Sequence, residues 1–349
     1  MADDAYVNRI LKAESKTAAA SADLMVVTAA MHGHVSDLIL LIAAKANINE
    51  TDSGGGYSRV RWPIDWAARN GHVAAVRLLL SAKVDVRRRD LMWEAADGGH
   101  TDVLQAFIDA KVDIATQQTH YSTPLCRAAE RGYINTVQFL LDVKANADTP
   151  EMGQADTAVT LASAQNHTDI LRVLIDAKAS VDALQAGLCS PVIVAVEAEH
   201  IEALQLLVNA KADLNTPSTP FPNRGYKQLP LFSAVVHKNN DALAILINAK
   251  AVVDESCEDP GALCLAVTEG NVDAVTMLLG AKANVNQRNL LNELPAELAL
   301  ASHNYEVLRL LIEAKADVTK EDSNETEISI EFAKLATGAP EVSPPMPWA

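Results

Sequence analysis

The fold of this chain is decided by a stretch near its middle. Residues 123–148 read TPLCRAAERGYINTVQFLLDVKANAD. The stretch opens with Thr123-Pro124 and is interrupted at Gly132. It ends at Lys144, which is followed by Ala-Asn-Ala-Asp. Apolar residues between these points recur at helical spacing. The stretch therefore predicts two short helices that are joined at the glycine.

The closing lysine recurs along the chain with an underlying period of 33 residues. The successive gaps are 38, 28, 33, 34, 33, 39, 32 and 33 residues, and the lysines are Lys45, Lys83, Lys111, Lys144, Lys178, Lys211, Lys250, Lys282 and Lys315. An alanine always lies sixteen residues before the lysine, where a small side chain lets neighbouring helices approach closely. Because one helix pair cannot bury its apolar face alone, the pattern predicts nine stacked repeats with a continuous core.

With these motifs the chain resembles the ankyrin repeat proteins. The fourth repeat carries Thr123-Pro124-Leu125-Cys126 and Gly132-Tyr133, and the eighth repeat ends in Ala283-Asn284-Val285-Asn286. The resemblance implies an all-α solenoid of stacked helix-turn-helix repeats with projecting β-turn or hairpin loops. It also implies a role in binding other proteins.

The repeat pattern divides the chain into four segments. We expect an N-terminal helical cap in residues 1–23, with a helix over 4–18, and nine repeats in 24–326. A capping helix follows in 327–337 and a Pro-rich tail in 338–349. Half-repeats with a polar outer face are what the ends of a stacked array require.

The recurring lysine departs from the family pattern, in which the resemblance implies a glycine in a left-handed conformation. A lysine in that conformation costs about 1 kcal/mol through crowding of its Cβ. A cation at a helix C-terminus returns about 0.3–1 kcal/mol, so the exchange is nearly balanced. The lysines are expected to form a ladder along one edge of the array. They can make specific contacts there or be a helix-closing feature copied by duplication, and the second interpretation is favoured.

Composition narrows the classes of function. The net charge of −16 argues against general binding to nucleic acid or to anionic membranes. No stretch reaches the roughly 18 apolar residues of a membrane span, and the acidic start is unlike a signal peptide. The four cysteines form no C-x-x-C pair, which is typical of free thiols in a reducing, cytoplasmic compartment or of small buried residues.

Motifs for catalysis, cofactors or metals are not found in the sequence. Five of the nine histidines, His34, His72, His100, His167 and His200, lie eleven residues before a repeat lysine. That regularity predicts histidines that cap and pack at a helix turn rather than metal ligands. The sequence therefore predicts a protein that is not an enzyme and that holds no cofactor.

Charge and aromatic residues gather near the N-terminus. Between residues 57 and 90 eight basic residues face three acidic ones, a net charge of +5, while residues 251–349 carry a net charge of −11. Arginine and tryptophan are enriched at binding hot spots. The candidate contact residues in this basic segment are Tyr57, Arg59, Arg61, Trp62, Trp66, Arg69, Arg87, Arg88, Arg89 and Trp93. The alternative is that the tryptophans seal these repeats and the arginines are only solvated.

Insertions and the tail supply the remaining candidates. The two longest gaps place insertions near residues 51–61 and 216–228, and the second insertion contains Phe221 and Tyr226. Insertions of a solenoid collect on one edge and often mark its binding face. The Pro-rich tail ends in Trp348 and predicts either an extended strap that docks on a partner or an inert terminus.

Two functions remain open after the sequence is read. The first is a protein-interaction scaffold, monomeric by itself, that binds partner proteins through its loop fingers and its inner helix face. The second is a permanent structural subunit of a large assembly, which an ordered tail and long insertions would suit.

Overall fold

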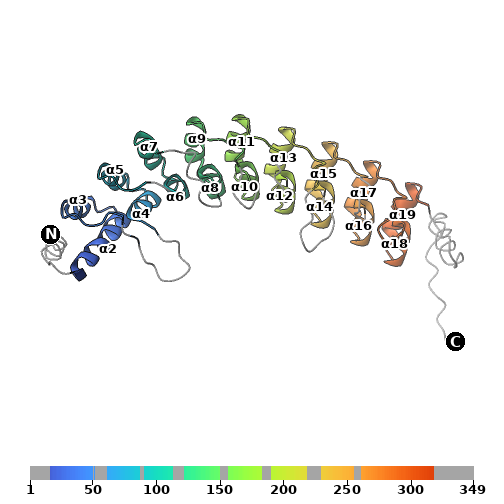
Figure 1. Cartoon of the computed structure of the whole chain (residues 1–349). Helices are drawn as coiled ribbons and strands as arrows, with labels where there is room; N and C mark the ends of the chain where they lie inside the picture. The colour runs from blue at the N-terminus through green and yellow to red at the C-terminus, as the bar shows by residue number, and fades with distance from the viewer. Residues whose placement is uncertain are drawn as a thin grey trace, which may run out of the picture. The chain divides into compact units, whose positions relative to one another are not determined.

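A computed structural model describes residues 16–49, 51, 61–86, 90–112, 122–149, 156–182, 190–217, 229–254 and 261–317. These residues form eighteen helices, α2 to α19, and no strand (Figure 1). Each predicted repeat contains a first helix with an even label and a second helix with the next odd label. The expected all-helical architecture of paired helices is therefore confirmed.

The chain divides into two compact units, Met1–Pro191 and Val192–Ala349. The helices of the first unit form repeats one to five: α2 (Lys16–His32), α3 (Val35–Ala43), α4 (Pro63–Arg69), α5 (Val73–Ser81), α6 (Leu91–Gly98), α7 (Thr101–Asp109), α8 (Pro124–Arg131), α9 (Ile134–Asp142), α10 (Ala158–Ala164) and α11 (Thr168–Asp176). Helix α2 runs without a break through residue 24, where the sequence places the start of the repeats.

The second unit contains repeats six to nine. Apart from Pro191, the first residue of α12, its helices are α12 (Pro191–Glu197), α13 (Ile201–Asn209), α14 (Pro230–Val236), α15 (Asn240–Asn248), α16 (Ala262–Thr268), α17 (Val272–Gly280), α18 (Pro295–Ala301) and α19 (Tyr305–Glu313). The predicted cap residues 1–15, the C-terminal capping helix and the tail lie outside the described residues.

The first helices begin at short polar or proline signals. Thr123 and Thr157 accept hydrogen bonds at their side-chain oxygens from the N–H groups of Cys126 and Thr160. A proline stands at the first position of several of these helices, where the missing N–H group has no helical partner to lose. The recurring alanine is at most 4% exposed in all nine repeats, as close helix packing requires.

Every repeat lysine has a positive φ, between 57° and 67°, and every one is exposed. In repeat four the Lys144 N–H donates to the Leu141 carbonyl at 2.9 Å, and the Ala145 N–H donates to the Leu140 carbonyl at 2.9 Å. These two bonds form the Schellman motif that closes a helix. The lysine therefore occupies the left-handed position that the sequence predicted for it.

Three of the recurring histidines, His72, His100 and His167, lie just before the second helices α5, α7 and α11 and reach back to the preceding repeat. The Nε2 atoms of His72, His100 and His167 lie 2.9, 3.0 and 3.2 Å from the carbonyl oxygens of Met31, Arg69 and Glu130. Each ring also covers a left-handed glycine of that preceding repeat. These three histidines therefore pack at the turn as expected, but none of them makes a side-chain cap hydrogen bond, so the expected capping is wrong for them.

Loop residues tie successive repeats together at the other end of the helices. Asp148 Oδ1 accepts the Ser180 N–H at 2.7 Å in the first unit. In the second unit Asn215 Oδ1 accepts the Val252 N–H at 2.8 Å, and Asn286 Oδ1 accepts the Asp317 N–H at 2.6 Å. In these three places a loop side chain of one repeat accepts a hydrogen bond from the backbone of the next repeat.

Candidate functional site

The structure describes five of the sequence-predicted contact residues, namely Arg61, Trp62, Trp66, Arg69 and Trp93. The others lie outside the described residues: Tyr57, Arg59, Arg87, Arg88, Arg89, Phe221, Tyr226 and Trp348. The candidate site is therefore built from the first helices of repeats two to four, α4, α6 and α8.

Helix α4 aligns three of these side chains. It starts at Pro63, and the Trp62 N–H donates to Asp65 Oδ2 at 3.0 Å, which satisfies one of the free donors at the helix start. Residues 62, 66 and 69 follow one another by four and three positions, so they share one face of the helix. Trp62, Trp66 and Arg69 are all half-buried on that face.

The same repeat positions in α6 and α8 carry charged residues. Counted back from the repeat lysine, Trp66 corresponds to Glu94 and Arg127, and Arg69 corresponds to Asp97 and Glu130. Stacking brings equivalent positions of adjacent first helices side by side. Charges of opposite sign on neighbouring repeats are therefore placed in contact.

Two arginines bind Glu94. Arg61 Nε lies 3.3 Å from Glu94 Oε1, and Arg69 Nη1 lies 3.2 Å from Glu94 Oε2. The Glu94 side chain is only 3% exposed. A buried carboxylate is costly unless it is paired, and these two contacts supply the pairing.

Three arginines surround Asp97, whose side chain is 1% exposed. Arg127 Nε donates to Asp97 Oδ1, and Arg131 Nε donates to the same oxygen at 3.0 Å. Arg69 Nη2 lies 2.6 Å from Oδ2 as an ion pair that is not aligned as a hydrogen bond. Burial alone raises the pKa of Asp97, but the hydrogen bond from Arg127 and the charges of the three arginines lower it below its usual value.

Two tryptophan rings lie under the guanidinium groups. Arg61 Cζ is 4.8 Å from the centre of the Trp66 ring, and Arg127 Cζ is 5.0 Å from the centre of the Trp93 ring. Both distances are within the range of a cation–π interaction. We call the set Arg61, Arg69, Arg127 and Arg131 with Glu94, Asp97, Glu130, Trp66 and Trp93 the guanidinium cluster.

Exposure is unequal across the guanidinium cluster. The arginine side chains are between 17% and 44% exposed, whereas the Glu94 and Asp97 side chains are 3% and 1% exposed. Glu94 and Asp97 lie beneath the arginines, whereas the Glu130 side chain is 32% exposed beside Arg127. The cluster sets four arginines against three carboxylates, a net charge of +1 in a chain whose net charge is −16.

Arg61 and Arg69 are held by carboxylates, so the view that the arginines are only solvated does not describe them. The sequence reasoning missed Glu94, Asp97, Arg127, Glu130 and Arg131. A signal for two of these pairings was present, since aligning the repeats places Asp97 opposite Arg69 and Arg127 opposite Glu94 on neighbouring first helices.

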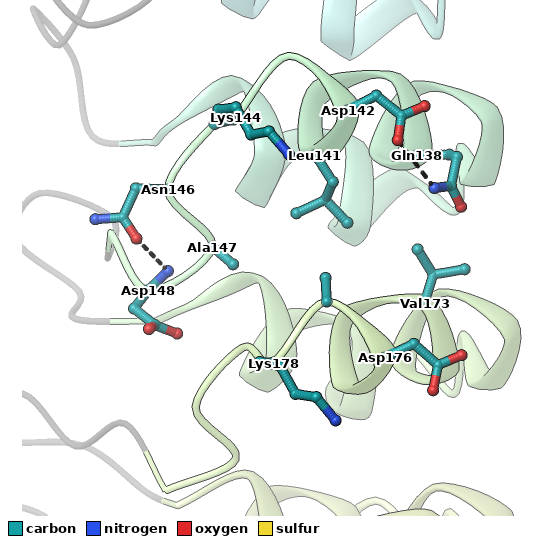
Figure 2. Close-up of a pocket in the computed structure, with 12 residues that line it drawn as sticks. Gln138, Leu141, Asp142, Lys144, Asn146, Ala147, Asp148, Val173, Asp176 and Lys178 are labelled. Carbon is teal, nitrogen blue, oxygen red and sulfur yellow. Dashed lines mark hydrogen bonds between the residues drawn. The ribbon is translucent and has the colours of Figure 1, made fainter.

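A second candidate is a surface cavity of about 640 Å³ between α9 and α11. Figure 2 shows Lys144, Asp142, Lys178 and Asp176 around it, with Leu141 among the apolar residues of its lining. The polar groups in view serve local structure, as when Asn146 Oδ1 accepts the Asp148 N–H at 3.0 Å. The cavity is thus formed by features that repeat along the chain.

Reactive groups are sparse in the described part of the chain. It contains no group of three or more residues that could hold a metal ion. Cys126 and Cys264 are free and buried, and burial, followed by the nearby Glu293, raises the pKa of Cys264 to about 11. That thiol is therefore protonated at neutral pH. None of the described helices is both long and apolar enough to span a bilayer.

Comparison with known proteins places the chain among repeat proteins. A profile for ankyrin repeats in three copies matches residues 91–185 and 231–322, and a second ankyrin profile matches residues 26–80. The crystal structure of the human ASB11 ankyrin repeat domain superposes with a TM-score of 0.53 at 22% identity, covering 65% of this chain and 99% of that domain.

Curated relatives share the repeats over part of their length. Ankyrin repeat and KH domain-containing protein mask-1 of Caenorhabditis elegans is 25% identical over 64% of this chain and 8% of its own length. Rabankyrin-5 of Mus musculus is 25% identical over 57% of this chain and 18% of its own. Ankyrin repeat and SOCS box protein 5 of Oryctolagus cuniculus is 31% identical over 32% of this chain and 34% of its own length. The chain thus spans about a third or less of the length of these relatives, and the profile matches show that it belongs to the ankyrin repeat family.

Proposed function

We propose that the chain is a non-enzymatic protein-interaction scaffold and that the first-helix surface of repeats two to four is one of its contact surfaces. Ankyrin repeats generally mediate protein–protein interaction, and the family match makes this role the expected one. The observation that carries the choice of surface is the guanidinium cluster, in which buried carboxylates fix arginines that face solvent.

The arrangement favours binding over stability alone. Replacing a buried ion pair by apolar residues is often neutral or stabilising, so a network of seven charged groups is a weak device for holding repeats together. The same network fixes arginine side chains before a partner arrives, which reduces the side-chain entropy lost on binding. Arginine beside tryptophan is also the composition of interface hot spots.

Affinity purification with mass spectrometry tests the proposal. The wild-type chain is compared with an R131E variant and with R309E, whose arginine is 63% exposed in a pair with Glu313 in the other unit. We expect R131E to lose a set of proteins that R309E retains. If both variants retain the same proteins, the surface of repeats two to four is not a contact surface.

The basic residues outside the described part of the chain are tested in the same experiment. An R87E/R88E/R89E variant is expected to lose the same partners as R131E if the basic segment forms one continuous contact. Size-exclusion of the native complex separates a scaffold from a permanent structural subunit, because only the subunit stays in a stable large particle.

A further inference from the structure

The contacts of Arg131 distinguish it from the other arginines of the guanidinium cluster. Its Nε donates to Asp97 Oδ1 at 3.0 Å, and this is the contact that the described residues give its guanidinium group. Its side chain is 44% exposed, the largest fraction among the four arginines. Both terminal nitrogens of Arg131 are therefore available to a ligand.

By contrast, Arg69 and Arg127 each use two nitrogens on carboxylates of this chain. Arg69 contacts Glu94 and Asp97, and Arg127 contacts Asp97 and Glu130. Their side chains are 28% and 19% exposed. They hold Asp97 in place, and Asp97 in turn holds Arg131.

We propose that Arg131 receives a carboxylate side chain from an acidic segment of the partner protein, through its two terminal nitrogens. The inference rests on the proposed function and names the partner's chemistry at the same surface. A guanidinium group and a carboxylate form two parallel hydrogen bonds, which is the strongest geometry open to such a pair. Arg131 is suited to this role because Asp97 holds its Nε atom and leaves the two terminal nitrogens pointing away from that contact.

The charge of the cluster favours one carboxylate over a phosphate. The four arginines carry +4, and Glu94, Asp97 and Glu130 carry −3, so the network has a net charge of +1. A single carboxylate neutralises this charge, whereas a phosphate near −2 leaves an excess negative charge above two buried carboxylates. The half-buried Trp93, under Arg127, offers an apolar surface beside the bound carboxylate.

The proposal is tested by titrating the full-length chain with synthetic peptides and following tryptophan fluorescence. The probes are a peptide of Glu and Leu residues, the same peptide with Gln in place of Glu, and the same peptide with phosphoserine in place of one Glu. We expect the Glu peptide to bind and the Gln peptide to bind at least about tenfold more weakly. Equal binding of the Glu and Gln peptides, or no binding of the Glu peptide, overturns the proposal.

Variants test the role of Arg131. R131Q is expected to weaken binding of the Glu peptide by about tenfold, R131K to weaken it less, and the matched control R309Q to stay within about twofold of wild type. R131Q binding as tightly as R309Q overturns the assignment. A phosphoserine peptide that binds about tenfold more tightly than the Glu peptide assigns the site to phosphate instead.

The D97N variant separates positioning from net charge. It makes the surface more positive by one charge, so attraction by net charge alone requires tighter binding of the Glu peptide. If Asp97 positions Arg131, binding weakens, provided that circular dichroism shows the variant to be folded. Tighter binding by D97N overturns the positioning role. The two proposals can also fail separately. If the Glu peptide does not bind, but the purification still shows that R131E loses proteins that R309E retains, the carboxylate ligand is refuted and the proposed scaffold function stands.

Discussion

Replacing Asp97 by Asn removes the charge on which three arginines converge. Removing one partner of a buried ion pair costs about 3–5 kcal/mol, because it leaves an uncompensated charge in the interior. Here the remaining charges belong to arginines that are 28%, 19% and 44% exposed, so water can hydrate them in part. We therefore expect D97N to lower the free energy of unfolding by about 2–3 kcal/mol, at or below the lower end of that range.

The matched control is the same substitution at Asp109. Its ion pair with Arg77 has a 3.7 Å separation, and both side chains are more than half exposed. Such surface pairs contribute about 0–1 kcal/mol, and Asp109 is the last residue of α7, where the helix dipole disfavours a negative charge. We expect D109N to change the free energy of unfolding by less than about 0.5 kcal/mol.

Both variants are measured by urea denaturation of the full-length chain with tryptophan fluorescence. Trp62, Trp66 and Trp93 lie in repeats two and three, so the signal reports mainly on the repeats that contain the guanidinium cluster. If D97N costs no more than D109N, removing Asp97 leaves no uncompensated charge in the interior and the reasoning fails.

The pH dependence gives the same prediction a second test. The folded-state pKa of Asp97 is lowered, so its contribution is fully present above its unfolded-state pKa of about 3.9 and is lost as the pH falls through the lower folded-state value. The difference between wild type and D97N is therefore expected to shrink below about pH 4. A difference that stays constant down to pH 2 contradicts the lowered pKa.

The remaining predictions concern the repeat framework and the tail. K178G is expected to be neutral or to stabilise by up to about 1 kcal/mol in thermal melts, because Lys178 has a φ of 66°; a large loss would show specific contacts of the lysine. G71A is expected to destabilise, since an added Cβ would lie 2.6 Å from the His100 ring at a φ of 76°, while G280A meets nothing within 4 Å and should be neutral in the same melts. Deleting residues 338–349 is expected to leave the melting temperature unchanged while weakening partner capture, and a fall of several degrees would mean that the tail packs on its own array.

The repeat framework could be predicted because it depends on single residues at fixed spacing. Lys144 and the alanine sixteen residues before it recur nine times, so their positions in the helix pair, and even the positive φ of the lysine, followed from one pattern. Local backbone rules are sufficient for such features, since each is closed by hydrogen bonds within its own repeat.

The guanidinium cluster could be predicted only in part. The basic segment of residues 57–90 ends four residues before Glu94 and seven before Asp97. Arg61 and Arg69 therefore looked unpaired in sequence, although their partners lie on the next first helix. Pairing across repeats depends on register and rotamer, which a linear count of charges does not contain.

The pairing across repeats also constrains how such an array can be recombined during evolution or in consensus design. The histidine contacts are interchangeable, since each uses a backbone carbonyl that any preceding repeat can offer. The charges are not interchangeable, because repeat three supplies the two carboxylates and repeats two and four supply the arginines that neutralise them. Exchanging repeat three for an average repeat would remove the carboxylate contacts of Arg61, Arg69 and Arg131 and leave Arg127 with Glu130 alone. Repeats two to four are therefore expected to be inherited and transplanted as one block.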